Sequence, residues 1–232
     1  MSKRVAIVQS NYLPWIGYFD LMNSVDEFVL YDEVQYTRRD WRNRNKVKTP
    51  DGPKWLTIPV ESKGNYFQPI SAVLVSEPRW FESHWKNLSF SYARAKFFEE
   101  TTSTLQPIFD QLEHLSLSSV NSTLLKSIAN RGGIRTEISD SLRYPGTGNP
   151  SERLANICVS AGASAYVSGP AAKAYLDPTP FNKEGIEIEF FRYPEYPAYN
   201  QQWGPFVPNL SVIDFIFNHG WSLDEYLADL RR

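Results

Sequence analysis

The densest group of candidate binding side chains is a basic segment in the first quarter of the chain. Six lysines and arginines fall within the eleven positions 38–48, interleaved with Trp41 and with asparagines. Guanidinium groups bind phosphate or carboxylate through two parallel hydrogen bonds, so this segment is suited to a phosphate-bearing ligand. The side chains expected to bind it are Arg42, Asn43, Arg44, Asn45 and Lys46. The alternative is a solvated loop whose cations pair with neighbouring acidic residues.

A second group, residues 9–18, combines amides with aromatic rings. Polar amides that directly follow an apolar strand need hydrogen-bond partners, and the start of a following helix favours an anion. We expect substrate contacts from Gln9, Asn11, Trp15 and Tyr18, and a catalytic role for Tyr12 in orienting the acceptor. The alternative is that the helix begins at Pro14 and its aromatic rings are core residues.

Acidic and amide side chains follow the next apolar run, residues 28–31. Asp32 is the best general-base candidate, although neighbouring arginines would make it a better orienting group than a strong base. Gln35, three residues later, is a candidate for substrate binding.

Two later segments add candidates. Ser168 and Gly169 follow another apolar run and are expected to bind substrate, with Lys173 as a catalytic cation one helical turn later. Asp214, near the start of a C-terminal helix, is expected to face the site. The alternatives are capping roles: Ser168 as a helix N-cap, and Asp214 as a first-turn acid.

The elements that must position these residues begin with a β-α-β unit. The apolar run 5–8 and the run 28–31 predict two strands buried on both faces, and residues 15–24 between them show helical spacing. Such a connection returns the chain parallel to its start, and ligands bind outside the carboxyl ends of parallel strands. The pattern predicts an α/β, Rossmann-like fold with a mostly parallel sheet, and Gln9 and Asp32 facing one crevice.

The remainder is expected to complete a single domain, residues 1–232. Residues 55–60 and 70–75 are strand-like and either pair as a hairpin or extend the sheet. Residues 78–131 predict a three-helix insertion that either caps the site or mediates a homodimer. Further strands are expected at 136–139, 165–168 and 186–191, and helices at 152–161, 171–176, 211–218 and 223–230.

Charge and composition exclude several classes of protein. The formal net charge of −2 lacks the basic excess that duplex nucleic acid requires, so no nucleic-acid partner is expected. No apolar run approaches the roughly 20 residues that span a bilayer, so no membrane insertion is expected. The first apolar run is too short for a signal peptide, and Cys158 is the lone cysteine, which together favour the cytoplasm.

Metal and cofactor sites are not expected. The histidines His84, His114 and His219 are scattered, without a second ligand at metal spacing. The glycine-rich fingerprints of dinucleotide, P-loop and hydrolase sites do not occur in the sequence. Cys158 is expected to be a buried core residue on the apolar side of a helix, and not a nucleophile.

Five segments together resemble the WbqC-like family: residues 9–20, 32–36, 41–45, 166–176 with Ser168-Gly169-Pro170, and 209–218. One departure is Ser10, where the family pattern leads us to expect proline. The resemblance implies a role in surface polysaccharide (O-antigen) biosynthesis. We expect a transferase acting on a small phosphorylated metabolite, such as a nucleotide sugar or a carrier-bound acyl group. The alternative is a non-catalytic binding or scaffolding module in a glycan assembly complex.

Overall fold

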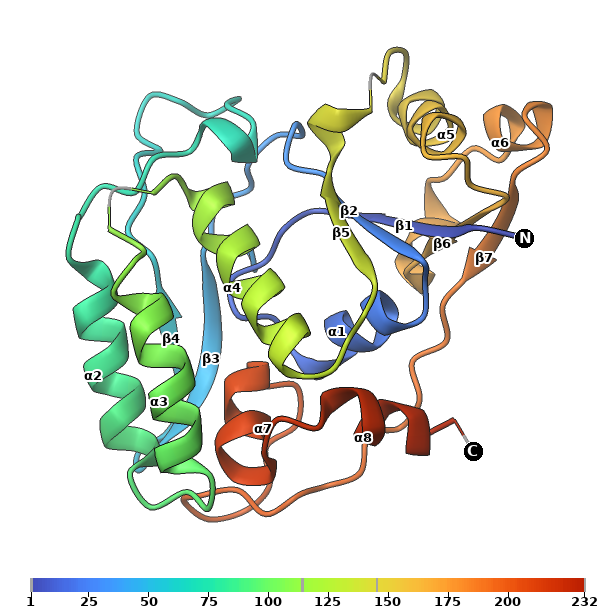
Figure 1. Ribbon diagram of the computed structural model, residues 1–232. Coiled ribbons are helices and arrows are strands. Elements are labelled where there is room, and N and C mark those ends of the chain that lie inside the picture. Colours follow the sequence, from blue (N-terminus) through green and yellow to red (C-terminus); the bar gives the residue numbers. More distant parts are fainter. Residues whose placement is uncertain (1, 114, 145, 232) are drawn as a thin grey trace.

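Five parallel strands form the central sheet of the computed structural model, which describes residues 2–113, 115–144 and 146–231 (Figure 1). The strands are β1 (Arg4–Val8), β2 (Glu27–Leu30), β5 (Glu137–Asp140), β6 (Ala165–Ser168) and β7 (Glu187–Phe190), in the order β5-β2-β1-β6-β7. Each neighbouring pair is parallel. The predicted α/β, Rossmann-like fold is therefore confirmed.

The order of the strands reverses between β1 and β6. After β1 the chain runs through α1 (Ile16–Asn23) to β2 on one side, and it later enters β6 on the other side and continues to β7. This reversal opens a crevice at the carboxyl ends of β1 and β6, the position where open α/β sheets bind ligands.

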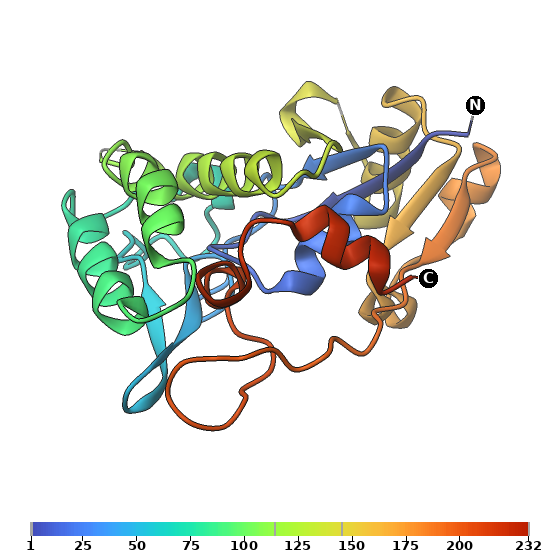
Figure 2. The same ribbon diagram turned by 60° about the horizontal axis from the view of Figure 1, so that its bottom comes forward.

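Alternation along the strands divides the core into two layers. On β1, Ala6 faces one layer, whereas Val5 and Ile7 face the other. The first layer includes α1, α7 (Val212–His219) and α8 (Leu223–Asp229), and the second holds α5 (Pro150–Ser160) and α6 (Thr179–Lys183). Figures 1 and 2 show these helices on opposite faces of the sheet.

The middle of the chain contains the three predicted helices, α2 (Trp80–Tyr92), α3 (Phe98–Phe109) and α4 (Leu117–Arg131). Their buried side chains join the same core layer as α1 and α7. This continuity supports our proposal that the chain folds as one domain. Among the described helices, none is long and apolar enough to cross a membrane.

The predicted pairing of residues 55–60 with 70–75 is reduced to one antiparallel bridge, between Val60 and Val75. The hairpin instead joins β3 (Arg44–Thr49) to β4 (Gly52–Thr57), and residues 70–72 form the 3-10 helix η1 (Ile70–Ala72). The β3–β4 turn includes Gly52, whose φ of +98° suits glycine. The sequence pattern did not reveal β3 because Val47 is the one apolar residue among its six.

Smaller elements complete the chain. The 3-10 helix η2 (Ser141–Arg143) follows β5, and η3 (Pro170–Ala174) follows β6 in place of the helix expected at 171–176. Residues 191–210 contain no regular element and run along the edge of the molecule to α7 (Figure 2).

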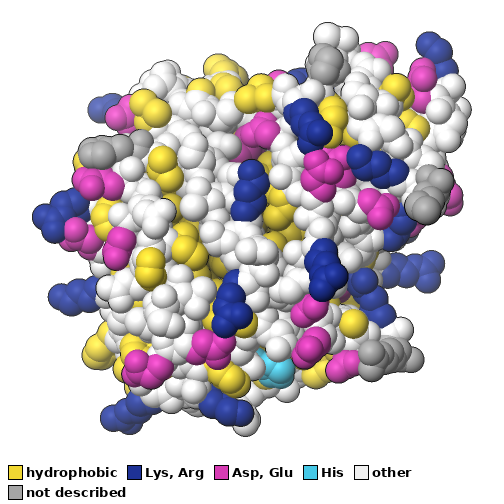
Figure 3. Space-filling view, viewed as in Figure 1, with side chains coloured by type: hydrophobic (Ala, Val, Ile, Leu, Met, Phe, Trp, Pro, Cys, Tyr) yellow, Lys and Arg dark blue, Asp and Glu magenta, His cyan; other side chains and the backbone are white. Residues whose placement is uncertain are grey.

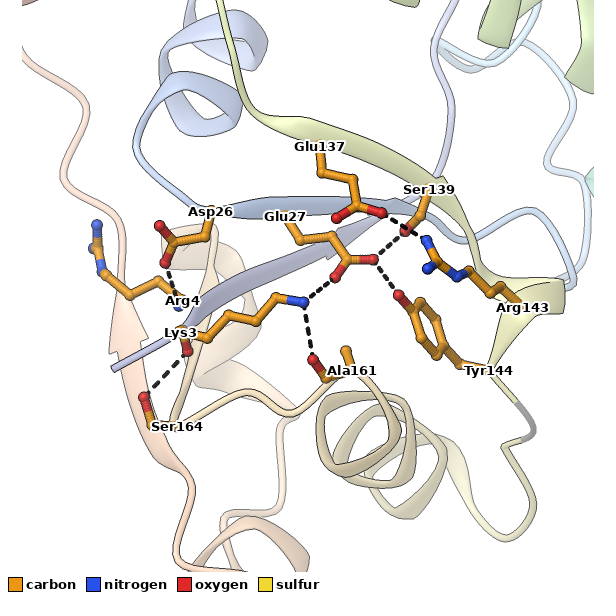
Figure 4. A network of polar contacts seen from close by, with 10 residues as sticks. All are labelled: Lys3, Arg4, Asp26, Glu27, Glu137, Ser139, Arg143, Tyr144, Ala161 and Ser164. Carbon is orange, nitrogen blue, oxygen red and sulfur yellow. Dashed lines mark hydrogen bonds and ion pairs between the residues drawn. The ribbon is translucent and has the colours of Figure 1, made fainter. Parts of the chain in front are cut away.

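A buried carboxylate joins several elements at the amino-terminal end of the strands, opposite the crevice. Glu27, at the start of β2, accepts hydrogen bonds from Lys3, Ser139 and Tyr144 (Figure 4). Lys3 also donates to the carbonyl of Ala161, at the end of α5, over 2.9 Å. These contacts join β1, β2, β5 and α5 away from the candidate site.

Candidate functional site

Arg42 joins the two sequence segments that carry most of the candidate residues. Its Nη1 donates to the Asn11 Oδ1 atom and its Nη2 to the Gln9 Oε1 atom. The carboxylate of Asp40 lies 3.7 Å from Nη2, beyond hydrogen-bond length, and the Arg42 side chain is 13% exposed. Burial lowers the pKa of Arg42, an effect that Asp40 opposes, but a guanidinium stays charged.

Gln9 connects Arg42 to the crevice at the end of β1. Its backbone carbonyl accepts a 3.0 Å hydrogen bond from the hydroxyl of Tyr18, which is otherwise buried against Phe19 and Phe28. The crevice has a volume of about 510 Å³ and reaches from Gln9 to Ser168 and Gly169 at the end of β6. The structure thus places candidate residues from both strand ends around one cavity.

Arg153 is a crevice residue that the sequence analysis missed. It follows a capping box at the start of α5, formed by Asn149 and Glu152, and its guanidinium lies 5.5 Å from the ring centre of Tyr31. Its closest carboxylate contact among the described residues is Glu33, at 3.9 Å. Its Nε atom is buried without a hydrogen-bond partner in the described part of the chain. The pair Asn149-Pro150, which is typical of a helix start, is the sequence feature that could have indicated that Arg153 lies in the first turn of a helix.

Asp32 organises the loop after β1 and is 2% exposed. Its Oδ1 atom accepts a 2.8 Å hydrogen bond from the Ser10 backbone N–H, and its Oδ2 atom accepts one of 2.7 Å from the Ser10 hydroxyl. Ser118, in the first turn of α4, donates a further hydrogen bond to Oδ2. The carboxylate therefore fixes the position of the loop and of α4.

Ser10, Ser118 and Asn121 are further residues that the sequence analysis did not select. The Asn121 amide donates to the Ser10 hydroxyl over 3.0 Å and to the Arg42 carbonyl over 2.9 Å. Single polar residues spaced along a helix give no distinctive sequence signal, because surface positions have the same composition. Ser10, where the family resemblance suggests proline, therefore donates hydrogen bonds to Asp32 and accepts one from Asn121.

Tyr12 lies in the core rather than at the surface of the site. It is fully buried, and its hydroxyl is 2.8 Å from the His84 Nδ1 atom. Because His84 Nε2 faces the carbonyl oxygen of Thr57 at 3.2 Å, Nε2 carries the proton and Nδ1 accepts from Tyr12. Burial lowers the pKa of His84 to about 4, so its ring is neutral at pH 7.

Two asparagines of the basic segment bind the hairpin region to its surroundings, and Gln35 binds a separate loop. Asn45 donates to the Leu13 carbonyl over 2.7 Å, Asn43 donates to the Ile58 carbonyl over 2.8 Å, and Gln35 donates to the Tyr66 carbonyl over 2.9 Å. The side-chain amides of these three predicted substrate-binding residues therefore donate to backbone carbonyl groups of the protein.

The cations of β3 do not converge on Arg42. The Arg44 guanidinium lies 4.1 Å, and the Lys46 ammonium 4.9 Å, from the ring centre of Trp55. Trp55 also contacts Trp41, with 5.4 Å between ring centres. Basic and acidic side chains are interspersed over the face shown in Figure 3.

Asn11 and Trp15 border a second, smaller pocket of about 280 Å³ beside Arg42. Its other lining residues are Pro14, Trp41, Asn45 and Asn209. Trp15 is fixed by contacts with the rings of Tyr193 and Tyr196. Asn11 lines this pocket and Gln9 lines the crevice, and Arg42 donates hydrogen bonds to both side chains.

The two remaining charged candidates lie apart from this arrangement. Lys173 is exposed, with its ammonium 5.0 Å from the ring centre of Phe190. Asp214 is buried and accepts hydrogen bonds from Tyr92 over 2.8 Å and from Tyr199 over 2.7 Å. Burial raises the pKa of Asp214, although these hydroxyl groups oppose the rise.

A metal ligand set is not found among the described residues, which contain no group of three or more His, Cys, Asp or Glu side chains able to hold an ion. His84 is occupied by Tyr12 and Thr57, and His219 stacks on Phe215. His114 lies outside the described residues.

Comparison with known proteins gives one family and one curated relative. Residues 9–225 match the model of the WbqC-like protein family. The uncharacterized protein Rv1507c of Mycobacterium tuberculosis is 45% identical over 230 residues, which cover 99% of this chain and 100% of that protein. No solved structure matches the chain.

Proposed function

Since the chain belongs to the WbqC-like protein family, we propose that it is a transferase acting on a phosphate-bearing small metabolite in surface polysaccharide biosynthesis. The metabolite is a nucleotide-linked sugar or a carrier-bound acyl group. The single observation that carries the proposal is the buried Arg42 guanidinium at the end of β1, which donates hydrogen bonds to two neutral amide oxygens and has one carboxylate, Asp40, at 3.7 Å. The proposed compartment is the cytoplasm, which suits the free, buried thiol of Cys158.

The charge of the buried Arg42 is only partly compensated, because its ion pair with Asp40, at 3.7 Å, is not a hydrogen bond, and this favours an anionic ligand. Removing a charge from water is costly unless an opposite charge or hydrogen bonds compensate it. Gln9 and Asn11 supply two hydrogen bonds to Arg42, but they supply no negative charge, and the Arg42 Nε atom is buried without a partner among the described residues. A phosphate oxygen would complete this coordination.

The adjoining crevice has the size and position for the rest of such a ligand. Its volume of about 510 Å³ lies within the range of roughly 300–1,000 Å³ for small-molecule sites. Arg153 places a guanidinium on the wall of the crevice, Gln9 connects the crevice to Arg42, and Tyr31 and Tyr175 add aromatic surface. A ligand with a phosphate and a flat ring fits these features.

The proposal gives the candidate residues distinct roles. Gln9 and Asn11 orient Arg42, and Ser168 and Gly169 line the opposite strand end. Asp32 is a positioning residue, because both of its oxygens already accept hydrogen bonds from the loop or α4. Tyr12 and Asp214 stabilise buried parts of the fold. Lys173 is kept as the proposed catalytic cation, exposed next to the crevice residues Ala171 and Ala172.

A thermal-shift screen tests the proposal. The purified protein is heated with nucleotide sugars, nucleoside phosphates, acyl coenzyme A species and free phosphopantetheine. A ligand at a hundredfold excess over its Kd stabilises the folded state by about 2.7 kcal/mol, which is a readily measured shift. The shift should vanish in Arg42→Gln and persist in Arg79→Gln, an exposed arginine paired with Glu82. No shift with any compound would favour the scaffolding alternative.

A further inference from the structure

The pocket of about 280 Å³ next to Arg42 differs in chemistry from the crevice. Its walls are formed by the indole rings of Trp15 and Trp41, Pro14 and three asparagines. None of these lining side chains is ionisable. The volume falls at the lower end of the range for small-molecule sites, which suits one ring rather than a whole nucleotide.

Amide groups in the pocket are available to a ligand. Asn11 uses its Oδ1 atom to accept from Arg42, while its Nδ2 group has no hydrogen-bond partner among the described residues. The Asn209 side chain likewise has no partner in the described part of the chain, and it is exposed at the rim. An amide both donates and accepts, which matches hydroxyl groups that do the same.

Of the two aromatic walls, Trp15 is fixed before any ligand binds, whereas Trp41 is 45% exposed. Trp15 packs against the backbone of Gly17, where an added Cβ atom would lie 2.3 Å from the indole. Leu13 is held with a φ of +43°, an unfavourable conformation for a branched side chain, while its carbonyl accepts the Asn45 amide. The Trp15 side of the pocket therefore needs little reorganisation to bind a rigid ring.

From these features we infer that the pocket is a subsite for one neutral pyranose ring. A pyranose presents an apolar C–H face that packs on indole and a rim of hydroxyl groups that pair with amides. Because Asn11 lines the pocket and also holds Arg42, a sugar ring bound here lies beside the proposed phosphate position. The inference deepens the proposed function and rests on it for the role of the sugar as substrate.

Saturation-transfer difference NMR with uncharged methyl pyranosides tests the subsite without any phosphate. The panel contains the methyl glycosides of glucose, galactose, mannose and rhamnose at pH 7. We expect transfer to the ring protons of at least one glycoside in the native protein. Transfer should fall about fivefold to tenfold in Trp41→Ala, as expected from the loss of one aromatic face. The matched control is Phe67→Ala, which removes an aromatic ring that is 86% exposed elsewhere on the surface.

A second variant guards against a folding defect in Trp41→Ala. Asn209 has a φ of +57°, which glycine also adopts, so Asn209→Gly removes the amide and keeps the backbone. The same loss of transfer is expected in this variant. Undiminished transfer in both variants, or no transfer with any glycoside, would overturn the subsite. If glycosides bind but no phosphorylated metabolite does, the proposed function fails while the sugar subsite stands.

Discussion

The carboxylate of Asp32 accepts a hydrogen bond from the Ser118 hydroxyl, which lies 86 positions later in the chain. The bond joins the residue after β2 to the first turn of α4. Asp32 also holds the Ser10 N–H and hydroxyl. The helical middle of the chain is therefore attached to the loop that positions Gln9 and Asn11.

Substitutions at this junction should destabilise the fold to different degrees. Ser118→Ala removes one hydrogen bond to a charged group and should lower the unfolding free energy by about 1.5 kcal/mol. Asp32→Asn places an NH₂ group against hydrogen-bond donors and should cost about 3 kcal/mol. Urea denaturation measures both values. An Asp32→Asn variant as stable as the native protein would contradict the role given to the carboxylate.

Tyr12→Phe should affect stability without affecting ligand binding. The variant removes the hydroxyl that His84 Nδ1 accepts, leaving a buried acceptor unpaired at a cost of about 1–2 kcal/mol. The affinity for a phosphate-bearing ligand should match that of the native protein when measured by titration. A catalytic Tyr12 would instead show native stability and lost turnover.

His84 should make stability depend on mildly acidic pH. Its pKa is lowered by burial from 6.5 to about 4, so the unfolded chain binds a proton at a higher pH than the folded chain. The contribution is fully present above pH 6.5 and is lost as the pH falls toward 4. Unfolding free energies measured between pH 7.5 and 4.5 should fall less steeply in His84→Gln than in the native protein. Parallel curves would contradict a buried neutral imidazole.

Gly17→Ala should damage ligand binding although it improves helix propensity. Alanine within a helix is ordinarily more stable than glycine by about 1 kcal/mol. Here the added Cβ would lie 2.3 Å from the Trp15 indole and push it out of its place. Weaker saturation transfer to the glycosides, with circular dichroism unchanged, is the expected result. Native transfer in this variant would show that the position of Trp15 is unimportant.

Lys3→Met should destabilise the sheet without altering the site. Burial favours a raised pKa for Glu27, but hydrogen bonds from Lys3, Ser139 and Tyr144 outweigh it and lower the pKa. This stabilisation is present above pH 4.5 and is lost as the pH falls through the folded-state pKa of Glu27. Because Lys3 is partly exposed, its removal should cost about 2 kcal/mol at pH 7. Chemical denaturation checks the loss, and unchanged ligand affinity confirms that the network is remote from the site.

Sequence patterns predicted the three central strands of the sheet well because these strands are nearly pure apolar runs. Residues 5–8, 28–31 and 165–168 are buried on both faces and carry a clear signal. β3 was missed because most of its residues are charged or polar, and the strand predicted at residues 55–60, which overlaps β4, was therefore given 70–75 as its partner. The sequence pattern of a short polar strand does not indicate which other segment will pair with it.

The site was predicted less completely than the fold. Arg42, Gln9 and Asn11 could be selected because charged and amide residues clustered at strand ends. Ser118, Asn121 and Arg153 come from helices distant in sequence, and only the packing of α4 and α5 brings them to the strand ends. Tyr12 was placed in the site by its sequence neighbours, whereas its side chain turns inward to His84.

Isothermal titration calorimetry with the best phosphate-bearing ligand tests the central role of Arg42 most directly. The native protein is compared with Arg42→Gln, Arg42→Lys and Lys3→Met. Removal of a buried charge that pairs with the ligand should cost about 3 kcal/mol, which is more than a hundredfold in Kd. We predict that loss for Arg42→Gln, a smaller loss for Arg42→Lys, and native affinity for Lys3→Met. Equal affinities in the native protein and folded Arg42→Gln would contradict the account.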